Sequence, residues 1–285
     1  MKGNNFNSLL LPAEMAKVAE ETGVYKTTKH PLKTFYLSVT AGMFISIAFV
    51  FYITSTVGTA GMPYGIAKLI GGICFSLGLI LCIICGADLF TSTVLIVVAK
   101  ACGRITWRQL LWNWVNVYIG NLAGALFFVL LIWLSGEYMT ANGGWGLNVL
   151  QTADHKMHHT FIEAVTLGIL ANLLVCLAVW MSYAGRTLMD KSMIMILPVA
   201  MFVASGFEHS IANMFMIPMG IVIRYFASPD FWNSINSSPA DFAHLTVVSF
   251  ITDNLLPVTI GNIIGGGVFV GLVYWVIYLR DTDYH

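Results

Sequence analysis

The chain has 285 residues, of which 58% are hydrophobic and 10% are charged, and its formal net charge at pH 7 is zero. An ordinary soluble domain carries about 25% charged residues, so this composition and a mean hydropathy of +0.79 exclude a soluble globular protein and indicate an integral membrane protein. The neutral charge, without a basic stripe, also argues against a nucleic-acid-binding protein.

The chain begins with a polar segment that contains no apolar run of signal-peptide length. Residues 8–23 have the pattern of an amphipathic helix, in which Pro12 suits the first turn and Gly23 is expected to end the helix. We predict that residues 1–33 form a cytoplasmic helix and linker and that the helix folds against the cytoplasmic mouth of the membrane domain. A simple membrane-surface anchor is the alternative.

Six charge-poor segments follow, long enough for the roughly 20 residues that a spanning helix needs. They lie near residues 34–56, 65–99, 109–135, 160–185, 192–224 and 254–279. Most of the 14 Lys and Arg residues fall on one side of these segments, and only Lys68, Lys156 and Arg224 fall on the other. The positive-inside rule therefore predicts that both termini are cytoplasmic, around a membrane domain over residues 34–280 with a tail at 281–285.

The second and fifth segments are too long for one straight crossing. About 34 residues at 1.5 Å each reach roughly 50 Å, whereas the hydrocarbon core is about 30 Å thick. Each segment is interrupted by a glycine with a carboxylate two residues later, Gly86 with Asp88 and Gly206 with Glu208. Interrupted helices at matching places in two halves point to a transport site.

Other short matches relate the two halves of the chain in the same order. They are Gly42 and Ser46 with Gly168 and Asn172, and G-N-L-A-G (120–124) with G-N-I-I-G (261–265). Because each half has three crossings, the halves must insert in opposite directions. The sequence therefore predicts an all-α integral membrane protein of six transmembrane helices, in two inverted repeats at about 34–135 and 160–279.

Three ionisable residues, Asp88, Glu208 and His209, lie deep in the apolar segments, where a bare charge is costly. Asp88 and Glu208 follow the glycines of the breaks, so we interpret them as caps of the next half-helix, with substrate or proton coupling as the alternative. His209 is the one histidine deep in a segment, and we assign it a pore role, with packing as the alternative. A haem site needs a second histidine at that depth, so no cofactor or metal is expected.

Several uncharged residues are also candidates for a conduit. Four amides are embedded in the segments and either clamp helices together or line a pore: Asn121, Asn172, Asn213 and Asn262. Phe75 and Leu79 lie one turn apart, and Phe202 lies one turn before the second break. Such side chains either narrow a conduit against hydrated ions or simply pack.

Two stretches resemble the characteristic blocks of the formate–nitrite transporter family. They are I-C-G-A-D-L-F-T-S (84–92) and G-I-L-A-N-L-L-V-C-L-A (168–178). Residues 203–220 and 257–267 resemble the formate branch of this family rather than its nitrite or hydrosulfide branches. The resemblance implies an aquaporin-like six-helix protomer and a homopentamer with one pore in each protomer.

The resemblance also implies roles for individual residues. Thr91 is expected to face His209 in the middle of the pore, and Phe75 and Phe202 to form a periplasmic constriction. A narrow apolar cytoplasmic side is expected from Leu79, Leu89, Phe90 and Val175. Polar pore-lining positions are expected at Asn172 and Asn262, and basic residues that draw anions into the two vestibules at Lys26 and Lys156.

The expected function is bidirectional, pH-dependent passage of formate and other small monovalent anions across the inner (cytoplasmic) membrane. A nitrite channel of the same fold is the alternative, and proton-coupled uptake remains open. No ATP-binding or hydrolase motif occurs, so no enzyme activity is expected. A membrane redox subunit needs paired histidines or cysteines at matched depths, and a water channel needs paired N-P-A motifs. The sequence has neither, so both classes are disfavoured. A cytoplasmic formate-producing enzyme is an expected partner of the N-terminal helix.

Overall fold

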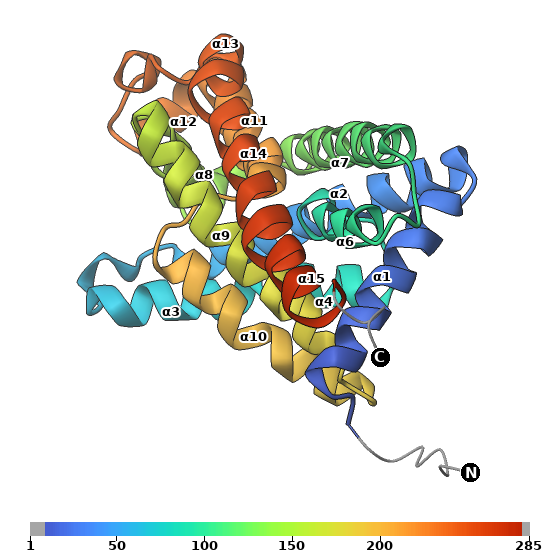
Figure 1. Ribbon diagram of the computed structural model, residues 1–285. Coiled ribbons are helices and arrows are strands. Elements are labelled where there is room, and N and C mark those ends of the chain that lie inside the picture. Colours follow the sequence, from blue (N-terminus) through green and yellow to red (C-terminus); the bar gives the residue numbers. More distant parts are fainter. Residues whose placement is uncertain (1–8, 281–285) are drawn as a thin grey trace, which may run out of the picture.

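The computed structural model describes residues 9–280, so the beginning of the predicted N-terminal helix at residue 8 and the tail at 281–285 lie outside the described residues. Over this range the chain forms helices and no strands (Figure 1). The first half consists of α2 (Pro31–Thr56), α3 (Tyr64–Phe75), α4 (Leu77–Ile84), α5 (Phe90–Thr93), η2 (Val94–Ile96), α6 (Val97–Ala101) and α7 (Trp107–Ser135). The second half consists of α9 (Phe161–Ser182), α10 (Leu188–Ala204), α11 (Ser210–Phe226), α13 (Val247–Ser249), η5 (Phe250–Leu255), α14 (Leu256–Ile263), η6 (Ile264–Leu272) and α15 (Val273–Tyr278).

Helices occupy the predicted positions of the six spans, and both predicted interruptions are present. The first, third and fourth spans are single helices, α2, α7 and α9, of 26, 29 and 22 residues, which suffice to cross a membrane. The second span is α3 with α4, a break, and α5 to α6; the fifth is α10, a break, and α11. The sixth runs from α13 to α15 and includes two π-helical stretches, η5 and η6, a form often found at functional sites.

Both breaks are built in the same way. Gly86 and Gly206 have φ angles of 77° and 72°, in the left-handed region that favours glycine. In each break the residue after the glycine donates a backbone hydrogen bond to the helix that has just ended. The N–H of Ala87 bonds to Cys82 O at 2.8 Å, and the N–H of Phe207 bonds to Phe202 O at 3.0 Å. This pattern closes a helix at a glycine, so the glycines fix where the spans are broken.

In the first half, an amide side chain on the third span forms hydrogen bonds both to the break in the second span and to the first span. Asn121 of α7 accepts a hydrogen bond from the N–H of Phe90 at 2.8 Å. Its Nδ2 group donates to the carbonyl oxygens of Ser38 at 2.7 Å and Asp88 at 3.0 Å. Asn121 is fully buried, so it acts as the predicted interhelical clamp.

Asn262 of α14 repeats this arrangement in the second half. It accepts from the N–H of Ser210 at 2.9 Å and donates to the carbonyl oxygens of Gly168 at 2.8 Å and Glu208 at 3.0 Å. The predicted pore-lining role of Asn262 therefore needs correction. Its amide is used inside the protein wall, because broken helices leave backbone groups that must be paired in a membrane.

These hydrogen bonds correct one detail of the predicted repeat. Ser38 and Gly168 accept equivalent bonds from the two clamps, so Gly42 corresponds to Asn172 and not to Gly168. The match of Gly42 and Ser46 with Gly168 and Asn172 is therefore displaced by four residues in the first span. Residues four apart share a helix face, so a short motif match cannot distinguish neighbouring turns.

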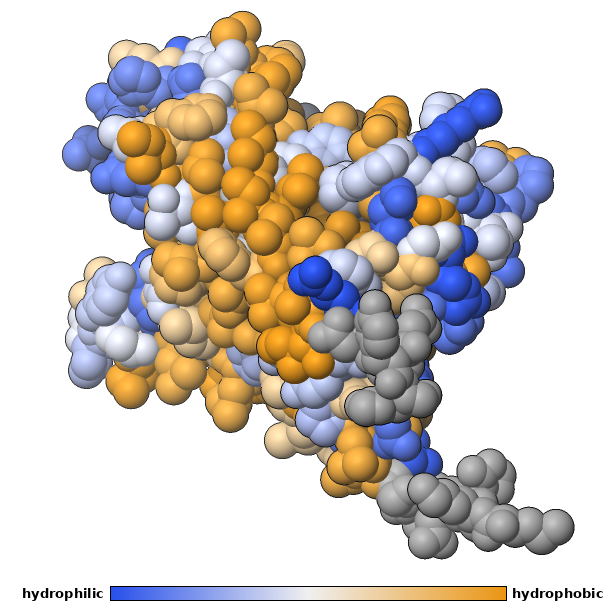
Figure 2. Space-filling model, in the orientation of Figure 1, coloured by the Kyte–Doolittle hydropathy of each residue, from blue (hydrophilic) through white to orange (hydrophobic). Residues whose placement is uncertain are grey.

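The polar elements gather at the two ends of the bundle. One end carries α8 (Gly144–Lys156) and α12 (Pro229–Ser234), and the other carries α1 (Pro12–Thr28) beside α6 and α15. Figure 2 shows a mainly hydrophobic face over α9, α14 and α15, with hydrophilic residues collected toward these ends. This apolar face, with the many large hydrophobic side chains that are exposed elsewhere on the molecule, suits contact with lipid.

The predicted end of the N-terminal helix at Gly23 is wrong, because α1 continues to Thr28. Gly23 lies buried in the middle of the helix, where a Cβ atom would be 2.8 Å from the Cβ of Ala99 and 3.3 Å from the Cα of Ile96. The glycine is there for close approach to α6 rather than for termination. α1 thus docks on the bundle, as predicted.

Candidate functional site

Thr91 of α5 and His209, which precedes α11, meet across the two breaks. Thr91 Oγ1 and His209 Nε2 are 2.8 Å apart, and both residues are buried. His209 Nδ1 accepts a hydrogen bond from the N–H of Ala212 at 3.1 Å, as the cap of α11. A nitrogen that accepts a hydrogen bond carries no proton, so the neutral imidazole has its hydrogen on Nε2. The ring therefore presents a donor at the centre of the bundle.

Aromatic rings separate this centre from one end of the bundle. Phe75 and Phe202 pack edge-on with ring centroids 5.9 Å apart. The ring of Phe202 also stacks on the His209 imidazole at 5.9 Å, and Phe49 packs against Phe75 at 5.2 Å. The structure thus brings both predicted constriction residues together, directly beside His209.

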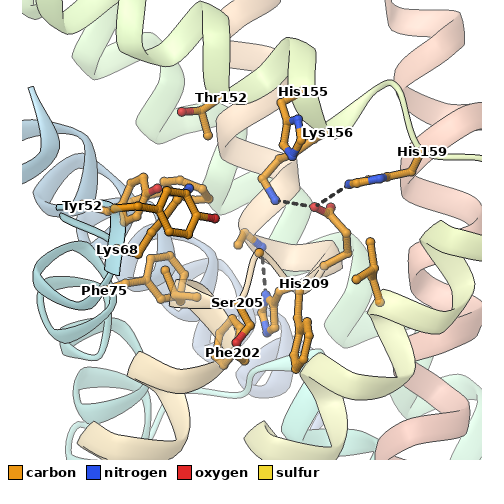
Figure 3. A pocket seen from close by; sticks show the side chains of 18 residues that line it. Tyr52, Lys68, Phe75, Thr152, His155, Lys156, His159, Phe202, Ser205 and His209 are labelled. Carbon is orange, nitrogen blue, oxygen red and sulfur yellow. Dashed lines mark hydrogen bonds and ion pairs between the residues drawn. The ribbon is translucent and has the colours of Figure 1, made fainter. Parts of the chain in front are cut away.

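A cavity of about 230 Å³ lies between these rings and the α8 end of the bundle (Figure 3). We call it the outer cavity. Its lining combines aromatic side chains with basic and hydroxyl groups, among them Tyr52, Tyr64, Lys68, Phe75, Thr152, His155, Lys156, His159, Phe202, Glu208 and His209. A cavity that ends on an apolar constriction suits a small polar solute that loses its water there.

Glu208 is the centre of a buried network at the edge of this cavity. Its Oε1 atom accepts a hydrogen bond from Lys156 Nζ at 2.8 Å and lies 3.8 Å from His159 Nε2. Its Oε2 atom accepts from the side-chain amides of Asn213 at 2.6 Å and Asn254 at 3.2 Å. Lys156 is therefore the partner of a buried carboxylate, and Asn213 orients that carboxylate.

Asp88 occupies the equivalent place in the first half. It forms ion pairs with Lys26, at 3.4 Å, and with Lys29, both from α1 or the residue that follows it. Lys26 Nζ also donates to Thr93 Oγ1 at 3.0 Å. Burial lowers the pKa of the Lys26 ammonium, and the carboxylate of Asp88 opposes this shift. Each break therefore carries a carboxylate that is neutralised by lysine.

The predicted capping role of Asp88 and Glu208 needs correction. Neither carboxylate bonds to a backbone N–H among the interactions of residues 9–280. The first N–H groups after the breaks are taken by Asn121, Asn262 and the imidazole of His209. The two carboxylates instead form ion pairs with lysines from distant parts of the sequence.

At the opposite end of the conduit, α1 covers a small cavity of about 70 Å³, which we call the inner cavity. Gly23 and Lys26 of α1 face Ser92, Val179 and Tyr183 across it. The predicted apolar residues Leu79, Leu89 and Val175 are buried in one core cluster.

Phe90 departs from its predicted place on the narrow side of the pore. Its ring packs edge-on against Tyr118 at 4.9 Å and Trp114 at 6.2 Å, both from α7. It thereby lines an apolar groove between α7 and α14. Neighbouring helical residues point about 100° apart, so Phe90 is directed away when Thr91 faces His209.

Asn172 of α9 forms hydrogen bonds to the backbone beside the Thr91–His209 pair. Its Nδ2 group donates to the carbonyl oxygens of Thr91 at 3.0 Å and Asn262 at 2.6 Å. Its buried Oδ1 atom has no hydrogen-bond partner within the described part of the chain. Asn172 therefore positions Thr91.

Sequence reasoning missed three members of these networks, Lys29, His159 and Asn254. All three lie at or beyond segment ends, where polar side chains are common, so no local pattern distinguishes them. Among residues 9–280, no group of three or more His, Cys, Asp or Glu side chains is placed to hold a metal ion.

Comparisons with known proteins agree with this geometry. The family model described as formate/nitrite transporter matches residues 13–276. The chain is 80% identical to the formate channel FocA of Escherichia coli K12 over the full length of both chains. It is 52% identical to the formate channel FocA of Haemophilus influenzae, over 92% of this chain and 93% of that one. A solved structure, a pentameric formate channel with formate bound, superposes with a TM-score of 0.84 at 54% identity, covering 88% of this chain and 98% of that one.

Proposed function

The chain belongs to the formate/nitrite transporter family, and from this premise we propose that it is a pentameric formate channel. The observation that carries the proposal is its identity to the Escherichia coli formate channel over the whole length of both chains. Its relatives are channels and transporters, so transport without catalysis is the function assigned here. Nitrite is the less favoured substrate.

The mechanism proposed is passage of the anion between the two halves of the protomer. At the Phe75–Phe202 pair the anion loses most of its water, and donors on the protein replace part of this hydration. The Nε2–H group of His209 and the hydroxyl of Thr91 are the donors at the centre. The positive end of the α11 dipole lies at the same point. Passage is bidirectional, either downhill or coupled to a proton gradient.

Formate flux measured in proteoliposomes tests this function. We expect rapid formate equilibration that is absent from protein-free liposomes, and slower equilibration of nitrite under the same conditions. A rate for formate equal to that of protein-free liposomes contradicts the proposal.

The orientation proposed is an inner-membrane protein with both termini in the cytoplasm, as the Lys and Arg distribution indicates. Two exposed positions at opposite ends test it, Asn233 in α12 and Leu188 at the start of α10. In spheroplasts, a membrane-impermeant maleimide is expected to label Asn233→Cys and to spare Leu188→Cys, with the unmodified chain as the control for native cysteines. The reverse pattern contradicts this orientation.

We also propose that α1 is a cover of the inner cavity. It closes that cavity with Gly23 and Lys26, and Arg104 after α6 forms ion pairs with Glu20 at 2.6 Å and with Glu21 at 3.0 Å. The opposite, solvent-facing side of α1 is the surface proposed for a cytoplasmic formate-producing enzyme.

Gly23→Leu is expected to lift α1 and to raise formate flux several-fold, because the new side chain has no space against Ala99. Gly61→Leu is the matched control, since a Cβ atom there meets nothing within 4 Å. Stopped-flow formate efflux from proteoliposomes measures the effect. A rate for Gly23→Leu at or below that of the unmodified chain shows that α1 does not limit flux.

A further inference from the structure

The outer cavity contains two lysines with different electrostatic surroundings. Lys156 is paired with the buried carboxylate of Glu208 at 2.8 Å. Lys68 of α3 has no carboxylate partner among residues 9–280; its ammonium lies over the ring of Tyr64, 5.6 Å from the centroid. Figure 3 shows Lys156 and His159 joined by dashed lines to one carboxylate, with Lys68 beside Tyr52 on the other side of the pocket. The uncompensated positive charge of this cavity is therefore that of Lys68.

Lys68 also borders a second, neighbouring cavity of about 250 Å³, which we call the side cavity. Four residues line both cavities: Tyr52, Lys68, Thr152 and His155. The remaining lining of the side cavity is neutral, and its polar members are hydroxyls and amides: Thr56, Thr59, Asn148 and Gln151. No carboxylate lines it, and a lysine surrounded by neutral hydrogen-bonding groups is suited to hold an anion.

His155 adds a neutral hydrogen-bonding group to this wall. Its pKa lies below the usual histidine range, because burial and the nearby His159 and Lys156 disfavour another positive charge; Lys68 acts in the same sense, and Glu208 opposes it. His155 is therefore neutral at pH 7, and the fixed charge of the wall resides on Lys68.

From this arrangement we propose that Lys68, with Tyr52, Thr152 and His155, forms an outer site that binds small monovalent carboxylates before they reach the Phe75–Phe202 constriction. The proposal rests on the proposed formate channel function and extends it. A water molecule occupies about 30 Å³ of liquid, so the side cavity has room for a small carboxylate that keeps part of its hydration shell. The site thereby raises the local anion concentration before dehydration begins.

The test compares Lys68→Gln with the unmodified chain in right-side-out membrane vesicles at low ionic strength. We expect initial formate influx at low external formate to fall about three- to tenfold, since one charge is removed close to the entry path. The saturating rate should stay within about twofold, and the difference should shrink in high salt. Lys68→Arg should restore influx, and Lys33→Gln, which removes an exposed lysine at the other end of α2, should have no effect.

A binding measurement separates this proposal from the channel function. Purified protein should broaden the NMR line of ¹³C-formate, and Lys68→Gln should lose at least half of that broadening, whereas Lys33→Gln should retain it. If the unmodified chain moves formate but Lys68→Gln matches it in low-salt influx and in line broadening, the outer site is wrong. If broadening depends on Lys68 but no formate crosses the vesicles, the site stands and the channel function fails.

Discussion

Replacing His209 with phenylalanine is expected to abolish formate flux while the protein still assembles. A phenyl ring fits beside Phe202, which already stacks on the imidazole, so packing is largely kept. The Nε2–H donor is lost, and the ring that faces Thr91 becomes apolar. An anion then meets a centre that has lost one of its two side-chain donors and gained an apolar ring, which costs several kcal/mol and corresponds to a loss of about 100-fold or more in rate. Stopped-flow flux and size-exclusion chromatography measure the two effects.

His209→Asn is the informative companion variant. Asparagine is a good cap residue and can donate a hydrogen bond, so passive efflux should remain. Proton-linked uptake should be lost, because an amide does not titrate. A proton relay through His209 requires an imidazole that is protonated on both nitrogens. Such an imidazole must give up the hydrogen bond that its Nδ1 atom accepts from the N–H of Ala212, so the relay has an energetic cost. If His209→Asn still accumulates formate along an imposed proton gradient, the histidine is a hydrogen-bond donor and not a relay.

Asn262→Leu is expected to prevent assembly of the folded protein. The substitution is nearly isosteric, but it removes the hydrogen-bond partner of the buried N–H of Ser210 and of the buried carbonyl oxygen of Glu208. The carbonyl oxygen of Gly168 loses one of its bonds and keeps the one within α9. Each unpaired group costs about 1–3 kcal/mol, and the sum for two groups reaches the lower part of the stability of a typical protein, about 5–15 kcal/mol.

The symmetry-related Asn121→Leu should have the same effect. Asn116→Leu is the control, because Asn116 also bonds from α7 to a carbonyl of α2, that of Pro31, but at the exposed surface. Size-exclusion chromatography in mild detergent after graded heating gives the readout. A normal elution profile and midpoint for Asn262→Leu would show that these groups find other partners.

Much of this architecture was predictable because membrane spans and their interruptions are local features. Segment length and charge located the spans, and a glycine before a carboxylate located both breaks. What was not predictable depended on contacts between distant residues. Asp88 meets Lys29, 59 residues away, and Glu208 meets Lys156, 52 residues away. Without those lysines in view, a carboxylate after a glycine is most simply interpreted as a cap.

The two neutralised carboxylates have a consequence for how current depends on voltage. Asp88 with Lys26 and Lys29 and Glu208 with Lys156 occupy equivalent places in inverted halves, but the first break holds one lysine more than the second. The aromatic pair Phe75–Phe202 lies on one side of His209. The energy profile of a permeating anion therefore differs between the two directions, and we expect the current–voltage relation of channels inserted in one orientation to rectify.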